Sequence, residues 1–179
     1  MSLEKHDCIW TIGHSTHSWD AFVALLHQFE IQLLIDVRHY PGSKRYPHFN
    51  KEHMEHVLPS AGIQYLHLVH LGGRRKPLPH SVNTGWQHNA FRGYADHMQT
   101  HSFKNAADVL QKEAKARSTA FMCSEAVWWS CHRSLLSDYL KIRGWTVLHI
   151  MGQKVKEHPY TSPARIEDGQ LKYSDPELF

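Results

Sequence analysis

The sequence predicts an α/β fold: a single domain with an open, mostly parallel sheet of about five strands and helices on both faces. Short apolar runs alternate with longer segments whose apolar residues recur at helical spacing, which is the pattern of β-α-β units. Five strands are too few for an eight-stranded barrel, so an open doubly wound sheet is favoured. The chain has 179 residues, 41% of them hydrophobic, which suits one domain over residues 1–179 with its own core.

Five short apolar runs predict the strands of this sheet. They lie at residues 8–12, 31–35, 63–69, 119–122 and 145–150. Runs of this length without strict alternation are typical of strands that are buried on both faces. Near the C-terminus, Asp168 and Gly169 separate two short segments that contain apolar residues, which predicts a small hairpin outside the main sheet.

Apolar residues at helical spacing predict the helices. These segments lie at residues 19–29, 50–58, 91–98, 103–114 and 132–143. Ser18, Ser102 and Ser130 stand just before three of them and are the expected N-caps. Gly62 and Gly144 follow two of them and are expected to end them.

Composition narrows the class of protein. No apolar stretch is long enough to span a membrane, and residues 1–5 lack the apolar segment of a signal peptide. Three cysteines are a small and odd number, which disfavours a disulfide framework. We therefore expect a cytoplasmic protein with no membrane partner. A net charge of +3 suits a small anionic ligand but does not by itself indicate nucleic-acid binding.

Polar, small and charged residues follow every predicted strand. In open parallel sheets, ligands bind beyond the carboxyl ends of the strands. We therefore expect these residues to meet at one edge of the sheet and to form a site there. In strand order they are His14, Ser15 and Thr16; Asp36 and Arg38; Gly72, Gly73, Arg74 and Arg75; Cys123 and Glu125 with, across the turn, Cys131, His132 and Arg133; and Met151 and Gly152.

The segment from Cys123 to Arg133 joins the fourth strand to the following helix and is the expected centre of the site. Cys131 follows the expected cap Ser130, so it should lie in the first helical turn. There the helix dipole, with His132 and Arg133 beside it, favours a thiolate nucleophile; a small packed side chain is the equally weighted alternative. Cys123 ends an apolar strand, and packing in the core is favoured over direct chemistry.

Two pairs of charged residues have both a structural and a functional interpretation. An arginine at a helix start is unfavourable for the helix dipole, so Arg133 is expected to have an anionic partner. The carboxylate nearest in sequence is Glu125, which either forms a salt bridge across the turn or takes part in catalysis. Asp36 and Arg38 should point to the same side of their strand, as an ion pair or as a ligand-positioning pair.

Two glycine-containing turns suggest sites for an anion. Residues 13–15 combine a glycine with polar side chains before a helix, and free N–H groups there could accept a phosphate. Residues 72–75 combine two glycines with two arginines. Neither turn is a P-loop or a dinucleotide fingerprint. Trp128 and Trp129 could stack on a base or sugar, but packing over the core is the expected role.

Several short motifs occur in an order that resembles the domain of unknown function 488 family. They are Thr-Ile-Gly-His-Ser-Thr at 11–16, Asp-Val-Arg at 36–38, Pro-Gly-Ser at 41–43, Phe-Asn at 49–50, Leu-Gly-Gly-Arg at 71–74, Phe-Arg-Gly-Tyr-Ala-Asp at 91–96, Met-Cys-Ser-Glu at 122–125, Cys-His-Arg at 131–133 and His-Ile at 149–150. The resemblance runs from about residue 9 to 173. It implies an α/β fold and a cytoplasmic protein of bacterial or archaeal type, but it does not supply an established reaction.

The favoured function is an enzyme, of hydrolase or transferase type, that acts on a small phosphate- or sugar-bearing, nucleotide-like substrate. The candidate catalytic residues are Cys131, Glu125, His132, Cys123 and His14, and the candidate substrate-binding residues are Ser15, Asp36, Arg38, Gly72, Gly73, Arg74 and Arg133. The sequence defines neither a cofactor nor an oligomeric state, and no metal ligands are assigned.

Two other functions remain open from the sequence. One is a non-catalytic module that binds a nucleotide or nucleic acid through basic residues, namely Lys44, Arg45, Arg74, Arg75 and Lys76. The other is a metal or redox protein that uses Cys123, Cys131 and a histidine. The chain contains 17 histidines, so chance matches to metal motifs are frequent, and the spacing of the cysteines fits no standard zinc pattern.

Overall fold

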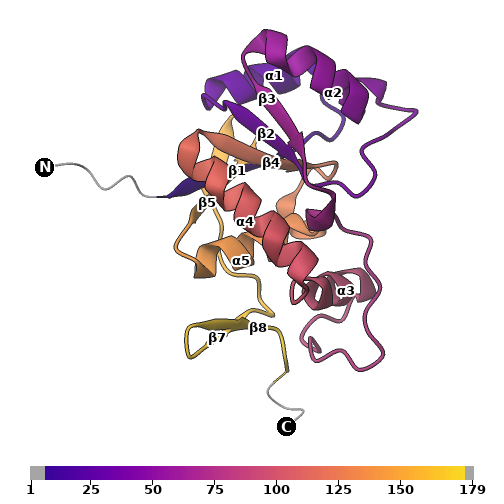
Figure 1. Cartoon of the computed structure of the whole chain (residues 1–179), viewed down its shortest axis with the longest axis vertical. Helices are drawn as coiled ribbons and strands as arrows, with labels where there is room; N and C mark the ends of the chain where they lie inside the picture. Colours follow the sequence, from indigo (N-terminus) through magenta and orange to yellow (C-terminus); the bar gives the residue numbers. More distant parts are fainter. Residues whose placement is uncertain (1–6, 176–179) are drawn as a thin grey trace, which may run out of the picture.

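A six-stranded mixed sheet forms the centre of the molecule (Figure 1). The computed structural model describes residues 7–175. The strands lie in the order β3-β2-β4-β1-β5-β6. Their bounds are β1 Cys8–Gly13, β2 Leu33–Asp36, β3 Gln64–His67, β4 Thr119–Cys123, β5 Thr146–Met151 and β6 Lys154–Glu157. β1 to β5 pair in parallel, and β6 pairs antiparallel with β5.

Helices cover both faces of the sheet, as the sequence predicts. α1 (Trp19–Gln28) and α2 (Lys51–Val57) lie on one side, whereas α4 (His101–Ala116) and α5 (Arg133–Ile142) lie on the other (Figure 1). α3 (Asn89–His97) precedes α4. Within the described residues, four short 3₁₀ helices connect the elements: η1 Pro47–Phe49, η2 Leu58–Ala61, η3 Val69–Leu71 and η4 Trp128–Ser130. The α/β architecture with a mostly parallel sheet is therefore confirmed.

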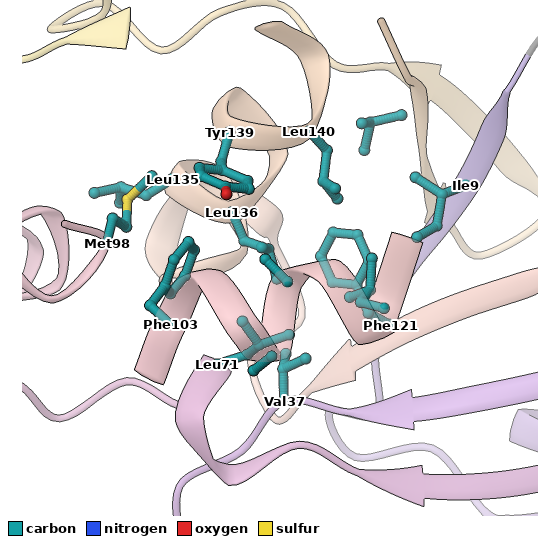
Figure 2. Packing of buried hydrophobic residues seen from close by; sticks show 14 of the residues in the cluster. Ile9, Val37, Leu71, Met98, Phe103, Phe121, Leu135, Leu136, Tyr139 and Leu140 are labelled. Carbon is teal, nitrogen blue, oxygen red and sulfur yellow. The ribbon is translucent and has the colours of Figure 1, made fainter. Parts of the chain in front are cut away.

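Each face of the sheet has its own apolar cluster. On the α4–α5 side, Phe121 of β4 packs with Phe103 and Leu136 of the helices (Figure 2). On the other side, Phe22 of α1 and Met54 of α2 belong to the second cluster. β4 is buried along its whole length because it contributes side chains to both clusters. This two-sided burial explains why apolar runs, rather than alternating patterns, predict the strands.

The sixth strand of the sheet was not predicted. All four residues of β6 are exposed, so Lys154–Glu157 shows no apolar run for sequence reasoning to detect. An edge strand with lysines is also a common way to discourage pairing with another chain. The predicted hairpin is confirmed as β7 (Arg165–Glu167) and β8 (Gln170–Lys172). Asp168 and Gly169 between them both have positive φ, at 51° and 72°, as a two-residue type I′ turn needs.

The cap of α1 is as predicted, but the cap of α4 is not. The hydroxyl of Ser18 accepts the N–H of Ala21 at 3.2 Å. The expected cap Ser102 instead lies inside α4, and Thr100 is the N-cap, accepting the N–H of Phe103 at 3.3 Å. The error arises because the helix begins two residues before the first apolar position of its repeat.

The start of α5 differs from the prediction in a way that affects the site. Ser130 belongs to the 3₁₀ helix η4, and the N-cap of α5 is His132, which makes no side-chain capping bond. Cys131 therefore lies before the helix rather than in its first turn. Its carbonyl accepts both the N–H and the hydroxyl of Ser134. The chain ends α5 as predicted, with Gly144 in the left-handed region at φ 92°.

Candidate functional site

A cavity of about 990 Å³ opens at the carboxyl edge of the sheet. Its lining residues follow four of the parallel strands, as the topology requires. Those after β1 are His14, Ser15 and Thr16; after β2, Arg38, His39 and Tyr40; after β3 and η3, Gly73 and Arg74; and after β4, Cys123, Ser124, Glu125, Cys131 and His132. Met151 and Gly152 are not among the lining residues, since they turn the chain from β5 into β6. The residues predicted after the fifth strand therefore do not join the site.

The two cysteines of the β4–α5 segment meet at the lining of the cavity. Cys123 ends β4 and Cys131 precedes α5, and their sulfur atoms are 3.0 Å apart. Both are free thiols and both are buried. The backbone N–H of Arg133 donates to Sγ of Cys131 at 3.4 Å, and its Nε donates to Sγ of Cys123 at 3.0 Å. The sulfur pair is thus held by one arginine from two directions.

The guanidinium of Arg133 is enclosed by the fold, with 1% of the residue exposed. Nη1 donates to the hydroxyl of Thr11 at 3.1 Å, and Nη2 donates to the carbonyl of Glu125 at 2.7 Å. The expected salt bridge between Arg133 and Glu125 is therefore wrong, because the arginine contacts the backbone and the Glu125 residue is exposed. Arg133 does not line the cavity, so it orients the sulfur atoms rather than contacting a ligand.

The two thiols differ in pKa, and Cys131 is the one that loses its proton more easily. Burial raises the pKa of Cys123, and donation of its S–H to Cys131 raises it further. Burial also opposes ionisation of Cys131, but the hydrogen bond from Cys123 and the charge of Arg133 outweigh it and lower the pKa of Cys131 to about 5. At neutral pH the pair therefore holds one proton on Cys123 and a thiolate on Cys131.

His132 presents an unprotonated ring nitrogen beside this thiolate. Its Nε2 donates to the carbonyl of Val37 at 2.8 Å, which leaves the lone pair on Nδ1. Burial lowers the pKa of His132, so the ring is neutral at neutral pH. A methyl group at Gly73 would lie 2.9 Å from Nδ1, which shows how closely the glycine backbone approaches the ring.

The polar groups at the ends of β1 and β2 form a second cluster. Asp36 and Arg38 point to the same side, as predicted, and form a buried ion pair with Nη2 of Arg38 2.7 Å from Oδ2 of Asp36. Nη1 of Arg38 donates to Nε2 of His14 at 3.3 Å, while Nδ1 of His14 donates to the carbonyl of Ser15. Burial lowers the pKa of His14 to about 4. Asp36 does not line the cavity, but Arg38 and His14 do.

The expected phosphate turn at residues 13–15 is not formed. The N–H of His14 donates to the carbonyl of Cys123, and the N–H of Ser15 donates to the carbonyl of Ser124, both at 3.0 Å. These amides extend the pairing of β1 with β4, so they are not free to hold an anion. At the other predicted anion site, Gly72 packs against His39, and only Gly73 and Arg74 line the cavity.

Aromatic rings and one arginine stand at the exposed part of the cavity wall. Tyr40 is 66% exposed, and the guanidinium of Arg74 lies 5.6 Å from its ring centroid. Trp129 is 52% exposed, contrary to the expectation that it covers the core. Trp128 does pack in the interior, where its ring stacks on His149. Tyr40 was missed because an exposed tyrosine in a loop carries no periodic pattern.

A buried chain of hydrogen bonds extends from Arg133 away from the cavity. The hydroxyl of Thr11, which accepts from Arg133, donates to Nδ1 of His149 at 2.7 Å. Nε2 of His149 donates to Nδ1 of His158, and Nε2 of His158 donates to Asp138, both at 2.8 Å. Every link has a donor and an acceptor when both histidines are neutral. Sequence reasoning missed this chain, although His149 belongs to one of the quoted motifs.

The geometry of the described residues does not support the hypothesis of a metal centre at the two cysteines. Between residues 7 and 175, no group of three His, Cys, Asp or Glu side chains is arranged to hold a metal ion. No helix within the same range is long and apolar enough to cross a membrane.

Comparison with protein families identifies the chain at the family level. The model of the domain of unknown function DUF488 matches residues 18–140. The chain belongs to this family. The DUF488 match contains the Asp36–Arg38 pair and the whole Cys123–Arg133 segment, whereas His14, Ser15 and His149 lie outside it. Neither the curated proteins nor the solved structures gave a match.

Proposed function

We propose that this member of the DUF488 family is a cysteine-dependent enzyme of hydrolase or transferase type. Its substrate would be a small phosphate- or sugar-bearing, nucleotide-like molecule. The observation that carries the proposal is the sulfur of Cys131, which borders the cavity and lies within hydrogen-bonding distance of a second thiol and an arginine N–H. A thiolate is a far better nucleophile than a thiol, so this arrangement favours covalent catalysis.

Two neutral histidines line the cavity, and one of them, His132, is available to accept a proton in such a reaction. Nδ1 of His132 can accept a proton from water or from an acceptor group that enters after attack by Cys131. His14 also lines the cavity, but its Nε2 already accepts the N–H of Arg38, so this ring can orient Arg38 rather than take up a proton. Because burial lowers the pKa of both rings, both are unprotonated at neutral pH, and His132 is the one with a ring nitrogen free to act first as a base. Glu125 also borders the cavity but is exposed, which suits substrate contact better than buried acid–base chemistry.

The substrate class follows from the outer wall of the cavity. Arg74 supplies a cationic group, and Tyr40 and Trp129 offer exposed ring faces. Aromatic faces beside an arginine stack on bases, and the guanidinium binds phosphate. A volume of about 990 Å³ is at the upper end of the range for small-molecule sites. A nucleotide or sugar phosphate fits this combination better than a long nucleic acid.

The first experiment identifies the ligand by thermal unfolding with nucleoside mono- and diphosphates and sugar phosphates. A ligand present at about 100 times its Kd should raise Tm by roughly 5 to 10 °C. Arg74→Gln should reduce this shift, whereas Lys154→Gln, on the exposed edge strand, should not. No shift with any member of the panel would contradict the proposed substrate class.

The second experiment tests catalysis on the ligand that binds. Cys131→Ser should reduce turnover at least about 100-fold while the ligand-induced shift in Tm remains, since only the nucleophile is replaced. Cys8→Ser is the matched control, because Cys8 lies at the start of β1, and it should retain full turnover. Turnover that survives Cys131→Ser would refute the assignment of the nucleophile, and binding without turnover in the native chain would favour the non-catalytic module.

A further inference from the structure

We propose that Cys123 and Cys131 form a reversible disulfide when a peroxide enters the cavity, so that the site is also a dithiol redox centre. Their sulfur atoms are already 3.0 Å apart, and a disulfide needs roughly 1 Å of further approach. Because they stand at the two ends of the β4–α5 segment, the cross-link closes a short loop. The inference needs no substrate and does not depend on the proposed enzymatic function.

The two sulfur atoms have different and complementary roles. Both cysteines border the cavity, but Cys131 is the more exposed of the two, at 7%, and receives hydrogen bonds from Cys123 and from the N–H of Arg133. It is the sulfur that a small oxidant meets as a thiolate. Cys123 is 2% exposed and retains its proton. A low-pKa thiolate next to a second thiol is the arrangement found in reversible redox sites.

The oxidation balances with one molecule of peroxide. The sulfur of Cys131 bonds to one peroxide oxygen as the O–O bond breaks, and the departing hydroxide takes a proton from the cavity solvent to become water. Cys123 then releases its proton, and its sulfur bonds to the sulfur of Cys131 as the S–O bond breaks. The second hydroxide leaves with that proton as water. Both cysteines are oxidised by one electron each, and the peroxide is reduced to two waters.

Arg133 makes the reverse reaction favourable in a reducing environment. In the dithiol state its Nε donates to the sulfur of Cys123 and its backbone N–H donates to the sulfur of Cys131, and its buried charge favours the nearby Cys131 thiolate. The disulfide has no negative charge, so the guanidinium would lose its counter-charge while still buried. A reduced form that is stabilised in this way belongs to an easily reduced disulfide. We therefore expect a mild thiol such as reduced glutathione to restore the dithiol.

The test uses the full chain and hydrogen peroxide in small molar excess, without any substrate. Intact mass should fall by two hydrogen masses, and two of the three thiols should become unreactive towards an alkylating reagent. Peptide mapping without reduction should join the segments that contain Cys123 and Cys131, and glutathione should reverse the change. An oxidised Cys131 without the cross-link, a cross-link that involves Cys8, or no reaction would each overturn the inference.

Two variants separate this chemistry from simple thiol damage. Cys8→Ser should form the cross-link as the native chain does. Cys123→Ser removes the resolving thiol, so peroxide should take Cys131 to the irreversible sulfinic acid. If Cys123→Ser is poorly folded, the peptide map of the native chain alone still decides the question. Because the cross-link is measured on the protein itself, its absence would leave the proposed enzymatic function standing, and the reverse also holds.

Discussion

Gly13 is the residue on which the position of Arg133 depends most directly. β1 passes so close to the β4–α5 segment that a methyl group at Gly13 would overlap the carbonyl oxygen of Glu125 and lie 2.9 Å from Nη2 of Arg133. This is the same carbonyl that Arg133 binds. The absence of a side chain at residue 13 is therefore a condition for the guanidinium to lie where its Nε donates to the sulfur of Cys123.

Replacing this glycine tests whether the arginine sets the state of the thiols. Gly13→Ala should lower the free energy of unfolding by about 1 to 3 kcal/mol, as overpacking in a core does. It should also raise the pKa of Cys131, since displaced Arg133 no longer favours the thiolate. Urea unfolding and the pH dependence of the rate of alkylation measure the two effects. Gly42→Ala is the control, because a methyl group there meets nothing within 4 Å; equal effects in both variants would contradict the argument.

At the scale of the elements, the buried series of hydrogen bonds from Arg133 to Asp138 connects α5 to β1 and β5. Asp138 and Arg133 lie on α5, Thr11 on β1 and His149 on β5, and each is buried. Hydrogen bonds between buried polar groups are costly to break, because the groups left behind find no water. We infer that this chain fixes the rotation of α5 about its axis, and with it the direction of the Arg133 side chain.

His149→Phe tests this role of the chain. The phenyl ring retains the stacking on Trp128 but leaves Thr11 and His158 without their ring partner. Stability should fall by about 1 to 3 kcal/mol for each group left unsatisfied. Lys156→Ala is the control, since Lys156 is exposed and pairs with His149 across the sheet, and it should change stability by less than about 0.5 kcal/mol. A loss of stability no greater than that of the Lys156→Ala control would show that these hydrogen bonds contribute little to the free energy of unfolding.

The stability of the whole molecule should depend on pH through the groups buried at the site. Burial lowers the pKa of His14 from 6.5 to about 4 and that of His149 from 6.5 to about 2. Despite its burial, Cys131 has a pKa lowered from 9.0 to about 5 by Cys123 and Arg133. In every case the unfolded state binds more protons than the folded state between the two values. Stability therefore rises with pH: the histidine part is lost below 6.5 and the cysteine part below 9.0.

We accordingly expect the free energy of unfolding in urea to increase from about pH 5 to about pH 8, by at most about 1.4 kcal/mol per pH unit for each group. Cys131→Ser should remove the rise above about pH 7, where the histidines are already neutral in both states, and should retain the rise below it. A flat profile in the native chain, or an unchanged slope above pH 7 in the variant, would contradict this assignment.

Whole elements were predictable where burial leaves a pattern in the sequence. The five parallel strands are apolar runs because each contacts a helical layer on both sides, and their order along the chain implies a shared carboxyl edge. β6 escaped prediction because its residues face solvent. The start of α5 was misplaced because Ser130 is a good cap by residue type, yet η4 uses it before the helix begins.

For the site, the sequence identified which residues gather but not which contacts they make. Cys131, His132, Arg38 and Arg74 border the cavity, as their positions after the strands predict. The predicted partner of Arg133, the carboxylate of Glu125, was wrong. Arg133 binds the backbone carbonyl of Glu125 instead, and a backbone contact cannot be inferred from residue types. Contacts between Thr11 and His149, 138 residues apart, likewise depend on a sheet register that no local pattern encodes.

The sequence alone determined the fold class and the edge of the sheet where polar residues meet, because apolar periodicity and the order of the strands can be read from it. The order of the short motifs likewise determined the family. Only the tertiary structure decided the chemistry of that edge. Parallel pairing of β1 with β4 uses the amides of residues 14 and 15, which removes the predicted phosphate turn. The same close packing at Gly13 places the guanidinium of Arg133 against the sulfur of Cys123, which lies 3.0 Å from the sulfur of Cys131. Thiol ionisation depends on such distances and on burial, and both exist only once the chain is folded.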